Sequence, residues 1–360
     1  SRRSAQRGLL TQRRFRCGWA SREMSLLHFN DHIFVAGARG MAGGAIVRAL
    51  EQAGYGQSAH GGALLTPSRA DLNLLDARAV NEWFETSKPT VVVLAAATVG
   101  GIQANSTRPA DFLLQNLQIQ TNVIEIAWRL GVRRLLFSGS SCIYPTISEQ
   151  PIREECLLNG SLEPTNEWYA IAKIAGIKLG EALRLQDGFD AISLMPTNLY
   201  GPGDNYNITG SHVLPAMIRR FQEAADQNLK SVTCWGSGSP LREFLHADDL
   251  GSACLFALEN WDPSHPSAPK DDQGKPLAFL NVGTGFDLSI KELAKQVARI
   301  VGYKGTIEWD ASKPDGTPKK QLNVSRLSNL GWTAKISLER GLPMAIEDFK
   351  QQRATGLLRS

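Results

Sequence analysis

The chain has 360 residues, of which 42% are apolar and 21% are charged. This composition is typical of a globular protein and excludes a disordered or fibrous chain. No apolar run approaches the roughly 18 residues of a membrane-spanning helix, so we expect no membrane association. The five cysteines lack paired spacing, which argues against disulfides and against a metal site and favours a reducing, cytoplasmic location.

The net charge of +4 comes from the N-terminal tail. Seven of the 39 basic residues and one of the 35 acidic residues lie in 1–23, so the remaining body has a net charge of −2. We expect residues 1–30 to be a disordered or extra tail, with Met24 as an alternative start. A transit peptide or a basic arm for nucleic acid would also fit its arginines. The acidic body argues against a nucleic-acid partner.

From residue 32 onward, buried strands alternate with amphipathic helices. We expect strands at 32–36, 63–66, 90–97, 133–139 and 190–195, and helices at 40–53, 77–87, 110–130 and 166–186. Such alternation predicts an α/β fold, a Rossmann-type doubly wound parallel sheet with right-handed crossovers. We expect residues 31–200 to form this dinucleotide-binding domain.

The pattern loosens after Pro196. Helices are expected at 212–226, 247–260, 289–301 and 337–350, short strands near 232–235 and 278–282, and a polar surface loop at 262–276. These elements predict a smaller α/β substrate domain over residues 201–350. The chain can return to the first sheet near 232–260.

The first strand runs into a glycine loop, in which Gly37, Gly40 and Gly43 form the pattern G-x-x-G-x-x-G. Glycines there permit a tight turn and the close approach of a pyrophosphate to a helix N-terminus. The second strand is followed by Arg69, where an NAD site would place an acidic residue. Together with Arg39, it can bind a 2′-phosphate, which favours NADP(H). The alternative is an ordinary turn with solvated arginines.

A catalytic set follows the fourth strand. Tyr169 and Lys173 are four residues apart, hence on one helix face, and Ser140 follows a strand at the edge where such sheets bind ligands. A lysine ammonium favours ionisation of a nearby phenol, the phenol exchanges a proton with a substrate oxygen, and a serine hydroxyl polarises that oxygen. The set predicts hydride transfer at a carbonyl carbon.

Longer blocks extend this set over residues 32–350. They are GARGM (37–41), AAATVGGI (95–102), GSSCIYP (139–145), LEPTNE (162–167), YAIAK (169–173), MPTNLYGP (195–202), WGSG (235–238) and REFLH (242–246). In these blocks the chain resembles the GDP-L-fucose synthase family of the extended short-chain dehydrogenase/reductase superfamily. That family inverts C3 and C5 of GDP-4-keto-6-deoxy-D-mannose and then reduces C4 with NADPH, giving GDP-L-fucose. The resemblance implies this activity here, and a homodimer that pairs helices 110–130 and 166–186.

The resemblance also implies roles for single residues. Ser140, Tyr169 and Lys173 would act at the C4 oxygen, while Cys142 and His212 would exchange protons with the two neighbouring carbons. Ordinary pKa values of ~8.5 for a thiol and ~6.5 for an imidazole suit proton exchange near neutrality. The structural alternatives are a buried apolar cysteine and a histidine that caps a helix.

Binding residues are carried over in the same way. The implied cofactor contacts are Gly37, Ala38, Arg39, Gly40, Met41, Ala42, Gly43, Arg69, Asp71, Leu72, Ser138, Gly139, Ser140, Ser141, Lys173, Pro196, Thr197, Asn198, Leu199 and His212. The implied contacts to the GDP-sugar are Arg220, Trp235, Arg242, Asp315 and Lys320. Ala38 and Pro67 replace a histidine and an arginine that are usual in the family, which weakens the expected preference for NADP.

Two other functions fit parts of the sequence. Another nucleotide-sugar epimerase or dehydratase of the superfamily would not need Cys142 and His212. A catalytically inactive NADP-binding scaffold would not need the complete set of Ser140, Tyr169 and Lys173.

Overall fold

A computed structural model describes residues 25–207, 210–313 and 315–358, so the arginine-rich segment 1–23 lies outside the described residues. The segment 25–30, expected to belong to the tail, packs onto the body. Leu27 is buried, and the backbone N–H of Leu26 donates to the carbonyl of Glu259 at 2.9 Å. The folded body therefore begins before residue 31.

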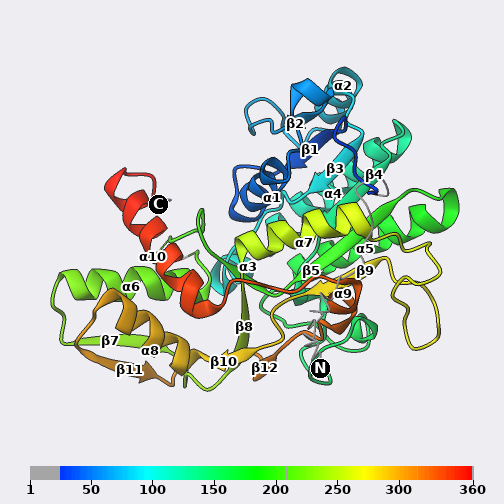
Figure 1. Cartoon of the computed structure of the whole chain (residues 1–360). Coiled ribbons are helices and arrows are strands. Elements are labelled where there is room, and N and C mark those ends of the chain that lie inside the picture. Colours follow the sequence, from blue (N-terminus) through cyan, green and yellow to red (C-terminus); the bar gives the residue numbers. More distant parts are fainter. Residues whose placement is uncertain (1–24, 208–209, 314, 359–360) are drawn as a thin grey trace, which may run out of the picture.

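The centre of the molecule is a six-stranded sheet in which every neighbouring pair is parallel (Figure 1). Its spatial order is β2 (Ala63–Leu65), β1 (His32–Ala36), β3 (Val91–Leu94), β4 (Arg134–Ser138), β5 (Ala191–Pro196) and β9 (Phe279–Val282). The chain runs outward from β1 in both directions, as in a doubly wound sheet. The predicted fold class is confirmed.

Helices cover both faces of this sheet (Figure 1). α1 (Met41–Gln52) and α7 (Ala247–Asn260) pack together on one face, and α2 (Ala77–Ser87), α4 (Pro109–Arg129) and α5 (Glu167–Asp187) cover the other. Strand β3 therefore consists of four fully buried apolar residues, each of which stabilises the fold by about 2 kcal/mol.

Local sequence signals set the ends of these helices. The carboxylate of Asp76 accepts hydrogen bonds from the N–H groups of Arg78 and Ala79 at 2.9 and 3.1 Å and so begins α2. Helix α5 ends at Gly188, whose φ of 67° is left-handed and unstrained only for glycine.

A second lobe has its own core. It contains β6 (Asn198–Tyr200), α6 (Val213–Asp226), β7 (Ser231–Trp235), β8 (Leu241–His246), β10 (Asp287–Ser289), α8 (Ile290–Val301), β11 (Thr306–Asp310), β12 (Lys319–Lys320) and α10 (Leu338–Ala354). β8 is its hub, because it pairs with β6, β10 and β12, while β7 pairs with β11. Phe221, Leu293 and Phe349 join α6, α8 and α10 in the buried cluster of this lobe.

No sequence pattern predicted β8, because the centre of this strand carries a charge. Glu243 is fully buried, and its carboxylate accepts hydrogen bonds from the N–H groups of Thr284, Gly285 and Leu322 at 2.6, 2.7 and 2.9 Å. These bonds compensate the desolvation of the carboxylate and tie β8 to two loops. Buried strands are identified in a sequence by runs of apolar residues, and the acidic Glu243 interrupts such a run.

The chain crosses between the lobes more than once. After β8 it returns through α7 and β9 to the large sheet, where α9 (Ser325–Leu330) packs against β9. The remaining short helices are η2 (Ser58–His60), α3 (Ile102–Thr107), η3 (Ser141–Ile143) and η4 (Glu154–Cys156), of which none was expected from the sequence. Among the described residues no helix is long and apolar enough to cross a membrane.

Candidate active site

The carboxyl ends of the central strands meet at one edge of the sheet. The registers align Ala36 with Leu94, and Leu94 with Phe137. Between this edge and the second lobe lies a cleft of about 1090 Å³, lined by residues of both parts. β3 ends at Leu94, three residues earlier than expected, and the segment 95–98 lines the cleft instead.

The glycine loop forms a cradle that only glycine permits. Gly37 has a φ of 86°, and a Cβ there would lie 2.8 Å from the backbone of Ala96. A Cβ on Gly43 would lie 2.1 Å from the carbonyl oxygen of Gly37. The N-terminus of α1 begins at this loop, so its N–H groups provide a site for a pyrophosphate. The cradle fits a dinucleotide.

Nineteen of the twenty predicted cofactor contacts line the cleft, and Asp71 does not. The carboxylate of Asp71 accepts hydrogen bonds from the N–H and the hydroxyl of Ser68 at 2.9 and 2.6 Å, which hold its pKa below the usual range. Asp71 therefore shapes the loop that carries Arg69. The two arginines, Arg39 and Arg69, are exposed along the glycine-loop part of the lining.

Lys173 and Tyr169 are both desolvated on α5. The ammonium of Lys173 donates to the carbonyl of Ser138 at 2.8 Å, and burial lowers its pKa to about 7. Burial raises the pKa of Tyr169, the charge of Cys142 raises it further, and the side chain of Ser140 opposes this rise through a hydrogen bond. Lys173 was expected to favour ionisation of the Tyr169 phenol, but desolvation outweighs that effect and keeps the phenol protonated.

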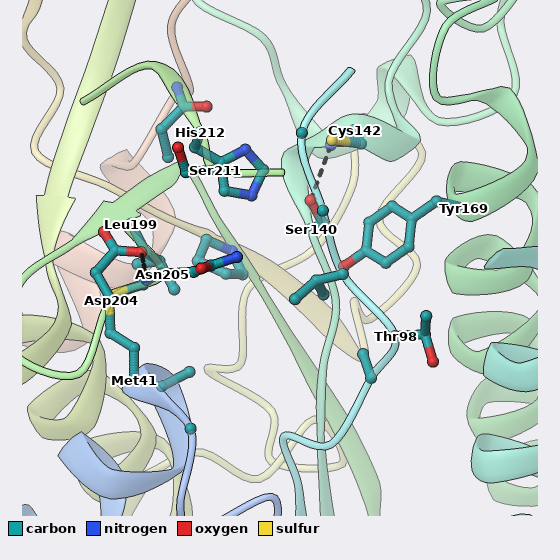
Figure 2. A pocket seen from close by; sticks show the side chains of 18 of the residues that line it. Met41, Thr98, Ser140, Cys142, Tyr169, Leu199, Asp204, Asn205, Ser211 and His212 are labelled. Atoms are coloured by element: carbon teal, nitrogen blue, oxygen red, sulfur yellow. Dashed lines mark hydrogen bonds between the residues drawn. The ribbon is translucent and has the colours of Figure 1, made fainter. Parts of the chain in front are cut away.

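Cys142 is held from two directions in the short helix η3. Its backbone N–H donates to the hydroxyl of Ser140 at 3.2 Å (Figure 2). Its sulfur accepts a hydrogen bond from the amide Nδ2 of Asn166 at 3.4 Å. Asn166 belongs to the block 162–167, but no sequence pattern indicated a role for this residue.

His212 lies on the other side of the cleft. Figure 2 shows its ring facing the space next to Ser140, opposite Cys142 and Tyr169. It is the N-terminal boundary residue of α6 and makes no side-chain cap, so the imidazole is available to the cleft. The surrounding protein lowers the pKa of His212, which keeps the ring neutral near pH 7 and able to accept a proton.

The five predicted substrate residues line the same cleft. Trp235 exposes 60% of its surface, and Arg220 donates to the carbonyl of Thr233 at 2.8 Å. Burial lowers the pKa of Arg242, while the nearby carboxylates of Glu163 and Asp315 raise it.

Two neighbours of these residues shape the substrate end of the cleft. The carboxylate of Asp315 accepts hydrogen bonds from the N–H and the hydroxyl of Ser237, both at 2.7 Å. Glu163, to which the sequence argument assigned no role, accepts a hydrogen bond from the hydroxyl of Thr317 at 3.4 Å. Lys320 lies in β12, beside Arg242 in the register with β8.

Comparison with known proteins agrees with this geometry. A family model described as the NAD dependent epimerase/dehydratase family matches residues 33–268. The chain therefore belongs to the NAD dependent epimerase/dehydratase family.

Within that family, the chain is similar to the GDP-L-fucose synthase of Escherichia coli K12. The two are 52% identical over 323 residues, which cover 90% of this chain and 98% of that protein. The resemblance inferred from the sequence blocks is confirmed.

Solved structures show the same likeness. A GDP-6-OMe-4-keto-L-xylo-heptose reductase from Campylobacter jejuni is 35% identical, with a TM-score of 0.82, over 91% of this chain and 99% of that one. A GDP-L-fucose synthetase from Naegleria fowleri bound to NADP is 26% identical, with a TM-score of 0.78, over 91% and 97%.

Proposed function

We propose that the protein converts GDP-4-keto-6-deoxy-D-mannose to GDP-L-fucose by inverting C3 and C5 and reducing C4 with NADPH. One observation carries this proposal. A single cleft contains a carbonyl-binding pair, Ser140 and Tyr169, together with two proton-exchanging side chains, Cys142 and His212, that face the cleft from different lobes (Figure 2). Reduction alone would need only the first pair.

NADPH fits the described residues. The glycine cradle would hold its pyrophosphate, Arg39 and Arg69 its 2′-phosphate, and Lys173 its nicotinamide ribose. When bound, it supplies the hydride for C4. The NADP-bound relative supports this choice of cofactor.

The inversions require a base and an acid on opposite faces of the sugar. A 4-ketone acidifies the hydrogens on C3 and C5, and hydrogen bonds from Ser140 and Tyr169 to the ketone oxygen stabilise the enolate. One of Cys142 and His212 removes a proton from one face, and the other returns a proton to the opposite face. Each inversion is therefore balanced, with no net gain or loss of protons.

Reduction uses the same oxygen contacts. Because desolvation keeps the phenol of Tyr169 protonated, Tyr169 donates its proton to the C4 oxygen as the hydride reaches carbon. Lys173 is fixed by its hydrogen bond to the end of β4. This bond keeps its Nζ close to Tyr169, 5.8 Å from the ring centre.

An assay with GDP-4-keto-6-deoxy-D-mannose and NADPH in D₂O tests the proposal. We expect NADPH oxidation, deuterium at C3 and C5, and GDP-L-fucose as product. Cys142→Ser and His212→Gln should each slow deuterium incorporation by about a hundredfold, the scale of one general acid–base group, and divert reduction to the unepimerised sugar. If the folded protein oxidised no NADPH and incorporated no deuterium into the sugar, the proposal would be refuted.

The same assay separates the competing enzyme classes. A 4-epimerase or 4,6-dehydratase of the superfamily holds its nucleotide tightly and consumes none, so it would leave the NADPH absorbance unchanged. A catalytically inactive scaffold would bind NADPH without altering any sugar.

We further propose a homodimer in the cytoplasm. Leu114 on α4 and Ile171 on α5 expose 56% and 37% of their surfaces, and these two helices pack against each other. An exposed apolar face on a helix pair is suited to forming a four-helix bundle with a second copy. The four cysteines in the described part of the chain are free, as in a reducing compartment. Leu114→Arg should yield monomers in light scattering, while Leu185→Arg, at an exposed position near the far end of α5, should not.

A further inference from the structure

Asn166 stands at the start of the catalytic helix but does not cap it. An asparagine at this position usually accepts a hydrogen bond from an N–H of the first helical turn. In α5 the side chain of Asn166 makes no such bond. The amide is directed instead into the cleft, whose lining includes Asn166.

The amide of Asn166 contacts the sulfur of Cys142. Its Nδ2 donates to Sγ at 3.4 Å, and its Oδ1 is buried with no hydrogen-bond partner among the described residues. The backbone of Cys142 is fixed separately by the hydroxyl of Ser140. Asn166 is therefore the polar group that orients the thiol itself.

An amide suits both protonation states of a thiol. A thiolate accepts a hydrogen bond from N–H, and a thiol donates one to C=O. Rotation of the amide by half a turn brings Oδ1 to Sγ in place of Nδ2. Because Oδ1 has no hydrogen-bond partner among the described residues, this rotation breaks no hydrogen bond of Oδ1. A side chain that exchanges protons in every turnover needs such a neighbour in both states.

We propose that Asn166 is a positioning residue for Cys142, and that its amide holds Sγ toward the sugar and stabilises the thiolate during epimerisation. The inference rests on the proposed function, since it assigns Asn166 to the inversions and not to the reduction. An amide stabilises the thiolate without introducing a charge. This matters because the same cleft must accommodate an enolate.

Other titratable groups face Cys142 and have to be separated from Asn166. Tyr169 and Lys173 on α5 both respond to the charge of Cys142, and His212 faces the same space from α6 (Figure 2). Each of them titrates, whereas Asn166 does not. Substitutions of Asn166 therefore test the hydrogen bond while every neighbouring charge is retained.

The first experiment needs no substrate. The rate at which iodoacetamide alkylates Cys142 is followed against pH by peptide mass spectrometry, which distinguishes Cys142 from Cys156. We expect Asn166→Ala to slow the alkylation of Cys142 about tenfold at neutral pH, the scale of one hydrogen bond. Asn166→Asp has nearly the same shape but adds a negative charge, so it should slow alkylation more than Asn166→Ala does.

The alanine variant separates electrostatics from packing. If Asn166 only filled space, Asn166→Ala would lower the thermal stability of the protein but Cys142 would still be alkylated at the wild-type rate. Asn159→Ala is the control, because Asn159 is exposed and its amide donates only to the carbonyl of Glu155 at 2.7 Å. Thermal unfolding verifies the fold of each variant, and Asn166→Asp serves if Asn166→Ala does not fold.

The second experiment measures the reaction. Deuterium incorporation at C3 and C5 should fall about tenfold in Asn166→Ala through kcat with little change in KM, and the share of unepimerised, reduced sugar should rise. Equal alkylation profiles and equal deuterium incorporation in the wild type and both variants would overturn the inference. Failure of the wild type itself to incorporate deuterium would instead refute the proposed function, and the alkylation profiles would still decide whether Asn166 stabilises the thiolate.

Discussion

The two walls of the cleft are built in different ways. The wall from the large sheet uses loops at the ends of neighbouring strands, and its glycine cradle is seven consecutive residues, 37–43. The wall from the second lobe gathers side chains from α6, β7, β8 and the segment 315–320. At its glycine cradle the first wall offers backbone N–H groups, whereas the second wall offers charged and aromatic side chains.

This difference indicates that one wall is suited to binding the cofactor and the other to binding the substrate. A dinucleotide is met by backbone at a strand edge, a solution that parallel sheets supply wherever glycine permits the approach. In the proposed function, the substrate is met by side chains such as Arg242, whose pKa is raised by the nearby carboxylates of Glu163 and Asp315. In the proposed function, reduction uses groups of the first wall only, whereas epimerisation uses Cys142 from the first wall and His212 from the second.

The largest expected effect concerns the first wall. Tyr169→Phe removes the proton donor for the C4 oxygen and should lower the rate of NADPH oxidation by about a thousandfold, within the range for general acid catalysis. Affinity for NADPH, measured by fluorescence quenching, should stay within a factor of two to three. A variant that still produces fucose at a tenth of the normal rate would show that another group protonates the oxygen.

The second wall should affect binding more than chemistry. Arg242→Ala removes a half-buried cation, and we expect kcat/KM for the GDP-sugar to fall about a hundredfold, mainly through KM. Arg242→Lys should recover only part of the lost kcat/KM, because an ammonium cannot form a bidentate pair with a phosphate. Arg299→Ala, an exposed arginine on α8 of the same lobe, is the control. A loss confined to kcat would contradict this division between the walls.

The burial of Lys173 should make the free energy of unfolding depend on pH. Burial lowers its pKa to about 7, so between pH 7 and about 10 the unfolded chain binds more protons than the folded one. Stability from this group therefore rises with pH in that window and is lost as pH falls toward 7. From pH 7 to 9, the free energy of unfolding of the wild type should increase relative to that of Lys173→Met by about 2 kcal/mol. Urea unfolding of both ligand-free proteins at the two pH values measures this, and parallel curves would contradict it.

The smallest expected effect lies at the cofactor end of the first wall. Arg69 is exposed, so Arg69→Ala should lower the preference for NADPH over NADH by only about tenfold, the scale of one charge-assisted contact. The ratio of kcat/KM for the two nucleotides gives the value. Arg78→Ala, on the exposed side of α2, should leave the ratio unchanged. An unaltered ratio in Arg69→Ala would assign the 2′-phosphate to Arg39 alone.

Several features could be predicted because their determinants are close together in sequence. The glycine loop, the spacing of Tyr169 and Lys173, and the five strands from β1 to β5 each depend on a few consecutive residues. The strand β8 could not be predicted, because its buried carboxylate, that of Glu243, depends on distant partners. The N–H groups of Thr284 and Gly285, which donate to it, lie more than forty residues later in the chain. Asn166 was part of a recognised block, but its partner Cys142 is 24 residues earlier.

The sequence by itself determined the parallel sheet, the dinucleotide loop and the chemistry of the candidate side chains, since helix periodicity, strand periodicity and glycine geometry are local properties. Only the tertiary structure decided how the pKa values of those side chains depart from their ordinary values. Desolvation raises the pKa of Tyr169, lowers that of Lys173 to about 7 and lowers that of His212. Desolvation depends on which distant segments cover a group, and no short stretch of sequence contains that information.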